Sequence, residues 1–445
     1  MATVRPFRAW RYNRQVIRNM ASVLAPPYDV IGESQYISYA ARSPHNIVYL
    51  TLAGAPFSPD PYLSRYPRAA DYWQHWRDEG IFIRDQAPAI YVYEQEYEDS
   101  LRGHIHRRAY IAAVKLHDYE ERVVLPHEEI RSAVRTDRLA MMRACQASFS
   151  QVFALFSDPD GAAEQIFAAQ TVGEAGFEVS DDEGVVHRMA PLTDSQRLAA
   201  FAEVLSDKQL VIADGHHRYS AALAYRDQMS SDQPNASDPP WDYVSMLLCP
   251  ADPDALTILP SHRMMRSLPH TGYDYLKEPA AGIFEVSRRE LPSGPADNSR
   301  AVRDILTEMH QLGSQEHVFG LYAGDNVVRL LTAPRGTSSL RDFAPEHSPA
   351  WRQLDLAVLH RIIIERLLGL TGHYAESQKN ILFTDSAEEA IAKVDIGEVA
   401  ATFLINPPRV KDVMQVAKAG DPMPQKGTHF YPKPLAGVAI YDLRA

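Results

Sequence analysis

Five consecutive residues near the middle of the chain, Asp214-Gly215-His216-His217-Arg218, combine residue types that can bind an anion and move a proton. A carboxylate can hold Mg²⁺, an imidazole can exchange a proton near neutral pH, and a guanidinium can bind a phosphate through two parallel hydrogen bonds. Glycine lets a ligand approach the backbone closely because it has no Cβ. The segment therefore predicts a phosphate-binding site.

The residues on either side predict the strand, tight turn and helix that would position this segment. Residues 210–213 are an apolar run of strand length, and polar residues then open a stretch with helical spacing. The first N–H groups of a helix have no partner within it, and the helix dipole adds partial positive charge there. We therefore expect the helix N-terminus and Arg218 to hold an anion together. Asp214 has two competing roles, Mg²⁺ ligand or helix cap, and the sequence does not choose between them.

A second candidate segment, Pro126-His127-Glu128-Glu129, follows a short apolar strand. Adjacent carboxylates repel each other, so one holds its proton more tightly and suits base catalysis near neutral pH. The alternative is an acidic, solvent-exposed turn before the helix expected over residues 136–147. Further contacts with a substrate or a phosphate are expected from four scattered polar positions: His127, His262, Arg263 and Lys426.

Composition and charge narrow the class of protein. The chain has 445 residues, which is long for one hydrophobic core and predicts two or three domains. Its net charge of −12 and the lack of a long basic run argue against extensive nucleic acid contact. The N-terminus lacks the apolar core of a signal peptide, and no stretch is long enough to span a bilayer. We therefore expect a cytoplasmic protein that makes no membrane contact.

Three regions are expected along the chain. An N-terminal region with a β-hairpin covers residues 1–109, a central core covers 110–265, and a C-terminal α/β region covers 266–445. Strands and helices alternate through the central core, which predicts a mixed α/β fold with polar strand ends gathered at one site.

Individual elements are also expected within these regions. Residues 89–97 and 107–116 have the residue types of two strands joined by a hairpin. Residues 285–300 are expected to be a connector because they contain Pro and Gly. Apolar residues at helical intervals over 354–367 predict a core-facing helix that ends at Gly369.

Seven motifs, spread in order over nearly the whole chain, resemble the family called domain of unknown function 1015. They are Ala25-Pro26-Pro27-Tyr28-Asp29-Val30, Pro126-His127-Glu128, Asp137-Arg138-Leu139, Ser157-Asp158-Pro159-Asp160-Gly161, Ala213-Asp214-Gly215-His216-His217-Arg218-Tyr219, Leu259-Pro260-Ser261-His262-Arg263, and Met423-Pro424-Gln425-Lys426 through Phe430-Tyr431-Pro432-Lys433. The sequence is identified as a member of that family, whose name assigns no chemistry.

The segment from Asp214 to Arg218 also resembles the nucleotide motif of the ParB and sulfiredoxin superfamily, most closely that of the free serine kinases. The resemblance covers about residues 110–265 and implies a ParB/sulfiredoxin-like nucleotide-binding core with flanking α/β regions. In those kinases an upstream glutamate is the general base for the serine hydroxyl. By position, the resemblance implies catalytic roles for Glu128, Asp214 and His217, with Asp214 also binding the metal. It implies nucleotide binding by four residues: Gly215, His216, His217 and Arg218.

The leading interpretation is a nucleotide-dependent phosphotransferase, a kinase that acts on the hydroxyl of a small metabolite, with free L-serine the first choice. Mg²⁺ with ATP or ADP is the expected cofactor, and CTP stays open. The alternative is a nucleotide-binding switch or NTP hydrolase of the ParB-like class with a protein partner. A third interpretation is a metal hydrolase, although its four ligands lack tight ligand spacing: His216, His217, His262 and Asp214. The sequence does not give the oligomeric state.

Overall fold

The computed structural model describes residues 1–52, 62–128, 132–168, 176–268, 282–292, 295–337, 343–370 and 380–444. Its contacts divide the chain into two units, of which unit 1 comprises Met1–Thr257 and Pro432–Ala445 and unit 2 comprises Ile258–Tyr431. The three expected regions do not correspond to these units. The expected boundary at residue 109 falls inside strand β5 (Gly103–Lys115), and the end of the chain returns to unit 1.

Unit 1 is built around a mixed sheet with the strand order β6-β11-β8-β12-β5-β4-β10-β9, and β1 pairs with β5. Its strands are β1 (Val4–Arg5), β4 (Ile90–Asp99), β5, β6 (Val124–Leu125), β8 (Val152–Phe156), β9 (Phe177–Ser180), β10 (Val186–Leu192), β11 (Leu210–Asp214) and β12 (Tyr243–Pro250). The pairs β6–β11 and β8–β12 are parallel, whereas β8–β11, β5–β12 and β4–β5 are antiparallel. The mixed α/β class and the β4–β5 hairpin are therefore confirmed.

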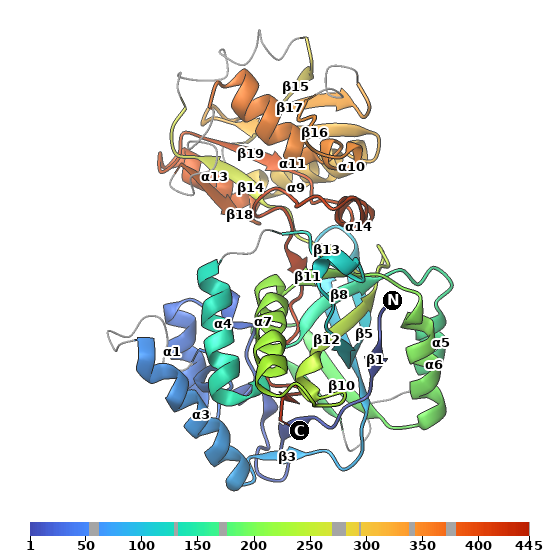
Figure 1. Cartoon of the computed structure of the whole chain (residues 1–445). Helices are drawn as coiled ribbons and strands as arrows, with labels where there is room; N and C mark the ends of the chain where they lie inside the picture. Colours follow the sequence, from blue (N-terminus) through green and yellow to red (C-terminus); the bar gives the residue numbers. More distant parts are fainter. Residues whose placement is uncertain are drawn as a thin grey trace. The chain divides into compact units, whose positions relative to one another are not determined.

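Helices cover both faces of this sheet (Figure 1). On one side lie α4 (Ser132–Cys145) and α7 (His216–Asp232), with α1 (Glu33–Arg42) and α3 (Tyr62–Asp78) beyond them, and on the other lie α5 (Ala162–Phe167) and α6 (Ser195–Ser206). The shorter elements are α2 (Val48–Thr51), η1 (Met20–Ser22), η2 (Tyr28–Val30), η3 (Tyr119–Glu121), η4 (Pro240–Asp242), β2 (Trp10–Tyr12), β3 (Phe82–Arg84), β7 (Ala147–Ser148) and β21 (Tyr441–Asp442). The antiparallel pair β7–β21 joins the C-terminal segment to unit 1.

Unit 2 contains a second sheet, with the strand order β15-β17-β16-β19-β14-β18. Its strands are β14 (His262–Met265), β15 (Glu285–Glu290), β16 (Glu316–Tyr322), β17 (Val327–Pro334), β18 (Ile381–Thr384) and β19 (Ala401–Ile405). Its helices are α9 (Pro295–Leu312), α10 (Pro349–Arg352), α11 (Asp355–Val358), the π-helical η6 (Leu359–Leu367), α13 (Ala387–Asp395) and α14 (Val410–Ala419). The two connections between the units carry short strands, β13 (Thr257–Ile258) and β20 (Phe430–Tyr431).

Alternating side chains of this sheet form a core on each of its faces. Val318 packs among buried residues of α9 and α13, whereas its neighbour Phe319 packs among those of α11 and η6. Successive side chains of a strand point to opposite faces, so a strand with helices on both sides is apolar throughout. The helix expected over 354–367 is confirmed as α11 followed by η6.

The connector expected over residues 285–300 is wrong, because this stretch contains β15 and the first turns of α9. Strand β15 lies at the edge of the sheet, and its Glu-Val-Ser-Arg-Arg-Glu sequence has no buried residue and only one apolar residue. An edge strand can be this polar because only one of its sides pairs with the sheet. Pro295 is the first residue of α9, a position where proline is favoured because its missing N–H costs the helix nothing.

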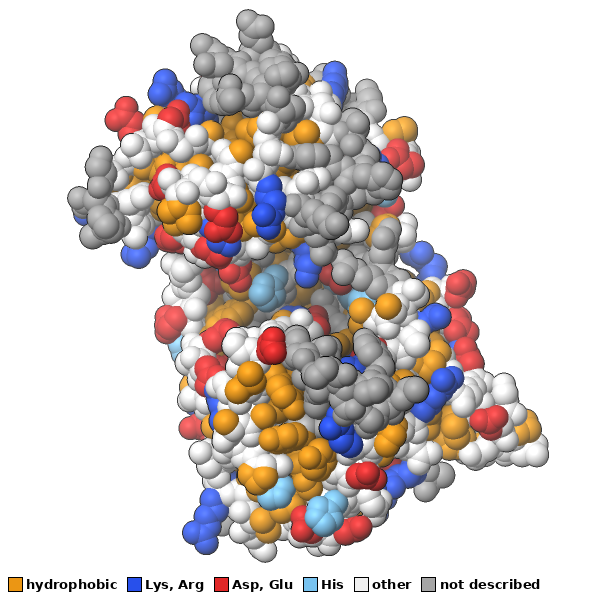
Figure 2. Space-filling view, turned by 90° about the vertical axis from the view of Figure 1, so that its left-hand side faces the viewer, with side chains coloured by type: hydrophobic (Ala, Val, Ile, Leu, Met, Phe, Trp, Pro, Cys, Tyr) orange, Lys and Arg blue, Asp and Glu red, His pale blue; other side chains and the backbone are white. Residues whose placement is uncertain are grey.

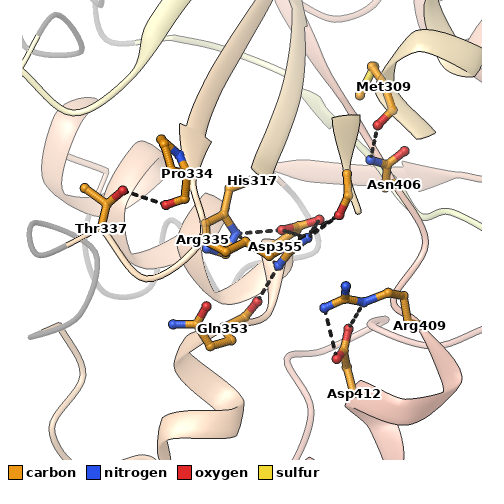
Figure 3. Close-up of polar contacts among 11 residues, drawn as sticks. Met309, His317, Pro334, Arg335, Thr337, Gln353, Asp355, Asn406, Arg409 and Asp412 are labelled. Atoms are coloured by element: carbon orange, nitrogen blue, oxygen red, sulfur yellow. Dashed lines mark hydrogen bonds and ion pairs between the residues drawn. The ribbon is translucent and has the colours of Figure 1, made fainter. Parts of the chain in front are cut away.

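A buried polar cluster ties α11 to the sheet of unit 2 (Figure 3). His317 of β16 contacts the Asp355 carboxylate through Nδ1 at 2.7 Å, and Arg335, after β17, donates to the same carboxylate at 3.0 Å. Arg335 also donates to the carbonyl oxygens of Gln353 and Gly313. Because the carboxylate meets two donor groups, the pairing fixes the start of α11 against the strands.

Surface side chains of unit 1 are mixed in character. Ile37 of α1 and Tyr72 of α3 are exposed hydrophobic residues, and Figure 2 views the molecule from the side of these helices. Hydrophobic, acidic and basic side chains are interspersed over this face. Among the helices that the structure describes, none has the length and apolar character needed to cross a bilayer.

Candidate functional site

The strand, turn and helix expected around Asp214 are confirmed. Strand β11 ends at Asp214, helix α7 begins at His216, and Gly215 between them is the N-cap residue with φ +93°. An L side chain is strained at that φ, which explains why glycine occupies the turn. Because Gly215 holds the cap position and α7 has no side-chain cap hydrogen bond, Asp214 is not the helix cap that the sequence left open.

Asp214 instead lies between two cationic groups. Its Oδ2 accepts a hydrogen bond from Arg218 Nη2 at 2.5 Å, and its Oδ1 accepts one from Lys433 Nζ at 2.8 Å. Lys433 also donates to Asp29 Oδ2 at 3.1 Å, and Arg218 donates to the backbone carbonyl of Gln151. The ammonium group has three N–H donors, so these two carboxylates leave one for another acceptor.

These charges stabilise one another in a buried environment. Burial alone would raise the pKa of Asp214, but Lys433 and Arg218 outweigh it and hold that pKa well below its ordinary value. Burial alone would lower the pKa of Lys433, but Asp214 and Asp29 outweigh it and raise that pKa. Both groups are therefore ionised throughout the physiological range, and at the N-terminal end of α7 the cations of Arg218 and Lys433 are paired with the carboxylates of Asp214 and Asp29.

Glu128 lies at the same helix end. Its strand β6 runs parallel to β11, with Val124 opposite Leu210, so both strands end at one edge of the sheet. Glu128 is three residues beyond the end of β6. Its Oε2 atom is 3.5 Å from Nδ1 of His216, and its side chain is 39% exposed. Residues far apart in sequence thus place a carboxylate, accessible to solvent, beside the first turn of α7. Glu129, which the sequence offered as a second carboxylate, lies outside the described residues.

The orientation of the His216 ring follows from its backbone contact. The N–H of His127 donates to Nε2 of His216 at 3.2 Å, so Nε2 carries a lone pair and the ring proton is on Nδ1. Burial, reinforced by the nearby His127, lowers the pKa of His216 well below its ordinary value, so the imidazole is neutral. A neutral ring whose Nδ1 lies 3.5 Å from Oε2 of Glu128 leaves the charge of that carboxylate unpaired by the imidazole. His127 is itself completely buried.

His217, the remaining histidine of the motif, is the second residue of α7 and is partly exposed. The structure thus places Glu128, Asp214, Gly215, His216, His217 and Arg218 at one strand-to-helix junction.

Two contributors to this junction were not among the predicted site residues. Lys433 reaches Asp214 from the tail, 219 positions along the chain, and Asp29 reaches Lys433 from η2. No spacing rule connects residues at such separations. Both residues belong to motifs that resemble the DUF1015 family, but the family resemblance assigns no chemistry to them.

The predicted contacts His262, Arg263 and Lys426 belong to unit 2, whereas Asp214 belongs to unit 1. Arg263 is completely buried, and its three nitrogens donate to neutral acceptors on His360, Ser261, Gln425 and Lys426. This arrangement leaves the guanidinium no donor directed at a phosphate. It instead fastens the tail loop to β14, and burial lowers the pKa of Arg263 to about 9.

His262 is also buried, and its Nδ1 accepts the backbone N–H of Ile405 at 3.1 Å. The metal-hydrolase interpretation needs Asp214, His216, His217 and His262 to form one group of ligands. Within the described ranges, no three His, Cys, Asp or Glu side chains are grouped as ligands for a metal ion. The geometry therefore gives the metal-hydrolase interpretation no ligand set.

A family model described as protein of unknown function (DUF1015) matches residues 4–357. The chain belongs to this family. The prediction made from the seven motifs is thereby confirmed, and the junction at Asp214 lies inside the matched region of this DUF1015 chain. Among curated proteins, none matches the sequence.

Solved structures similar to this DUF1015 chain include a conserved hypothetical protein from Pyrococcus furiosus, with 11% identity and a TM-score of 0.30, covering 70% of this chain and 88% of that one. A free serine kinase in complex with AMP has 12% identity and a TM-score of 0.30, covering 72% and 88%. A variant of a free serine kinase in complex with ADP has 11% identity and a TM-score of 0.32, covering 72% and 89%.

The turn glycine provides a test of how closely the junction is packed. A Cβ on Gly215 would lie 2.9 Å from Nε of Arg218, whereas Gly161, the N-cap of α5 with φ +64°, has no atom within 4 Å of that position. Gly161→Ala should lower the unfolding free energy by about 1–2 kcal/mol through backbone strain alone. Gly215→Ala should lower it by about 1–3 kcal/mol more, because the guanidinium bound to Asp214 must move. Urea denaturation measures both, and equal losses would contradict the packing.

Proposed function

We propose that this protein is a cytoplasmic, nucleotide-dependent phosphotransferase that phosphorylates the hydroxyl of a small metabolite, with free L-serine the first acceptor to test. In this proposal the N-terminal end of α7 binds the phosphates of ATP or ADP through Gly215, His216, His217 and Arg218. Glu128 is the general base for the acceptor hydroxyl. Lys433 is added to the phosphate-binding groups because its ammonium donates hydrogen bonds to Asp214 and Asp29 and has a third N–H that a phosphate oxygen can accept.

The single observation that carries the proposal is the position of Glu128. A phosphotransferase needs a phosphate-binding surface and a base within reach of the acceptor beside it. The carboxylate of Glu128 lies 3.5 Å from Nδ1 of the first residue of α7, at the helix end where the N–H groups lack intrahelical partners and where Arg218 and Lys433 are paired with Asp214 and Asp29.

The proposed step balances as a transfer between two oxygen atoms. The acceptor hydroxyl gives its proton to Glu128, its oxygen bonds to the terminal phosphorus, and the bond from phosphorus to the bridging oxygen breaks. The nucleotide leaves with that electron pair and one phosphate fewer. Helix N–H groups, Arg218 and Lys433 stabilise negative charge on the transferring group, the largest contribution expected in phosphoryl transfer.

Magnesium enters this proposal with the nucleotide. Mg²⁺ usually keeps several waters and is bound by substrate phosphates plus one or two carboxylates. Both oxygens of Asp214 contact cationic groups in the structure, so Asp214 does not fit the role of a preformed metal ligand. The proposed mechanism therefore assigns Asp214 the positioning of Arg218 and Lys433.

Phosphorus NMR tests the proposed function directly. The protein is incubated with Mg²⁺ and ATP, ADP or CTP, with and without L-serine and other small hydroxyl compounds. The proposal expects a phosphomonoester signal that appears only when an acceptor is present. Release of inorganic phosphate at the same rate with and without an acceptor would favour the alternative, an NTP hydrolase or switch of the ParB-like class.

A further inference from the structure

The side chain of Tyr28, the first residue of η2, has no part in the proposed phosphoryl transfer. The next residue, Asp29, accepts a hydrogen bond from Lys433 at 3.1 Å, and Lys433 donates to Asp214 at 2.8 Å. Pro27, with φ −58°, comes directly before η2, and a proline ring restricts this backbone angle. Two polar contacts and a stiff backbone therefore hold η2 beside the strand-to-helix junction at Asp214.

The ring of Tyr28 packs against a buried arginine of α4. The guanidinium carbon of Arg138 lies 3.8 Å from the centre of the ring, which is close enough for a cation–π contact. Arg138 is itself held in place, because it donates to the carboxylate of Asp137 at 2.7 Å and to the backbone carbonyl of Thr51 at 3.0 Å. The position of the ring is therefore fixed by contacts that do not involve its hydroxyl group.

The hydroxyl group of Tyr28 lies among the charges of the junction. Burial, the largest influence, raises the pKa of Tyr28 above its ordinary value, so the phenol keeps its proton at physiological pH. The cations of Arg138 and Arg218 act on the same oxygen and lower the pKa, whereas Asp29 and Asp214 raise it. Because the energy between charges falls with distance, this oxygen lies near the N-terminal end of α7. A protonated phenol there can donate a hydrogen bond.

The hydroxyl of Tyr28 has no hydrogen-bond partner within the part of the chain that the structure describes, and the residue is partly exposed. Other tyrosines of the same helical layer differ in this respect. The hydroxyl of Tyr66, in α3, donates to Asp137 at 2.8 Å. That of Tyr219, in α7, donates to the backbone carbonyl of His117 at 2.7 Å. These two hydroxyls hold the fold together, whereas that of Tyr28 is left for water or for an atom of a ligand.

A phosphate at this end of α7 needs donors that the ion pairs leave over, because the cations there are already paired with carboxylates. The N–H groups of the first turn of α7 and the third N–H of Lys433 are such donors. The hydroxyl of Tyr28 is another, and it comes from a different segment of the chain. We propose that Tyr28 donates a hydrogen bond to a phosphate oxygen of the bound nucleotide. This inference rests on the proposed function, because it needs the nucleotide at that helix end.

Tyr28→Phe tests the proposal, because it removes the donor and keeps the ring against Arg138. The affinity for ADP should fall by about 10- to 100-fold, the usual effect of losing a hydrogen bond to a charged group. The midpoint of urea denaturation should stay the same, because the hydroxyl has no partner in the described part of the protein. Isothermal titration with ADP and Mg²⁺ measures the affinity.

Inorganic pyrophosphate separates the phosphates from the rest of the nucleotide. If the hydroxyl of Tyr28 contacts a phosphate, Tyr28→Phe should weaken pyrophosphate binding by about the same factor as ADP binding. A loss of affinity that is confined to ADP would overturn the proposal, because Tyr28 would then contact the nucleoside.

The matched control is Tyr36→Phe, which makes the same change in α1. Tyr36 is also partly exposed, and its hydroxyl has no hydrogen-bond partner among the described residues. Burial raises the pKa of Tyr36, and the side chains that act on its hydroxyl are Tyr49, Tyr72 and Arg68, none of which belongs to the junction. Tyr36→Phe should therefore bind ADP and pyrophosphate as the unmodified protein does.

The remaining outcomes separate this inference from the proposed function. Equal ADP affinity in Tyr28→Phe and the unmodified protein would overturn the role of Tyr28 and leave the phosphotransferase proposal standing. A lower urea midpoint in Tyr28→Phe would also count against the inference, because the hydroxyl would then have a partner within the protein. If the unmodified protein binds neither ADP nor pyrophosphate, the proposed function and the inference both fail.

Discussion

Glu128→Gln is expected to lower the rate of phosphoryl transfer by about 10²- to 10⁴-fold, the usual contribution of a positioned general base. The amide keeps the size of the side chain and can still contact His216, but it cannot take the acceptor proton. Nucleotide affinity should stay nearly unchanged, because the phosphates are assigned to the end of α7. Steady-state kinetics and isothermal titration with ADP measure the two effects separately.

The matched control is Glu120→Gln, which changes an exposed glutamate of η3. This control variant should have the turnover and ADP affinity of the unmodified protein. A parallel loss of ADP affinity and turnover in Glu128→Gln would contradict the assignment of Glu128 as a base, since it would place the residue in nucleotide binding instead.

Lys433→Met is expected to lower the free energy of unfolding by about 3 kcal/mol, as is typical when one partner of a buried ion pair is removed. Asp214 then keeps Arg218 but loses the cation on its other oxygen, and it remains buried. Urea denaturation measures the change. Lys411→Met, which alters an exposed lysine of α14, is the control and should be within about 0.5 kcal/mol of the unmodified protein.

The pH dependence of this loss identifies the partner of Lys433. The pKa of Asp214 is lowered by folding from 3.8, so its ion pair stabilises the fold above that pH and is lost as the pH falls through the folded value. The pKa of Lys433 is raised by folding from 10.5. Its contribution to the free energy of unfolding is therefore complete below pH 10.5 and is lost as the pH rises through the folded value. The difference in unfolding free energy between Lys433→Met and the unmodified protein should therefore be constant from about pH 5 to 9. It should shrink in more acidic solution. A constant difference down to about pH 2 would contradict the pairing with Asp214.

Local sequence was sufficient to predict the junction itself. An apolar run that ends at Asp214, a glycine, and helical spacing from His216 onward are signals contained within twenty residues, and the structure has β11, a left-handed glycine and α7 there. Glu128 was placed at the site by resemblance and by its loop position. The parallel pairing of β6 with β11 explains why the two segments meet.

Long-range contacts were beyond the reach of the sequence. Lys433 joins the site because the chain leaves unit 1 after Thr257 and returns at Pro432, a path that composition does not reveal. Strand β15 was missed because its exposed edge position allows a polar sequence, and the burial of Arg263 was missed because arginine is mostly a surface residue. In each case the deciding factor was a partner distant in sequence.

A crystal structure of the protein with ADP and Mg²⁺ tests the central claim most directly. The account predicts that the phosphates lie at the N-terminal end of α7, with oxygens within hydrogen-bonding distance of the backbone N–H of His216 and of Lys433 Nζ, and with Glu128 facing the terminal phosphate. A nucleotide bound elsewhere in the molecule, with the contacts of Asp214 to Arg218 and Lys433 undisturbed and no phosphate beside them, would contradict it.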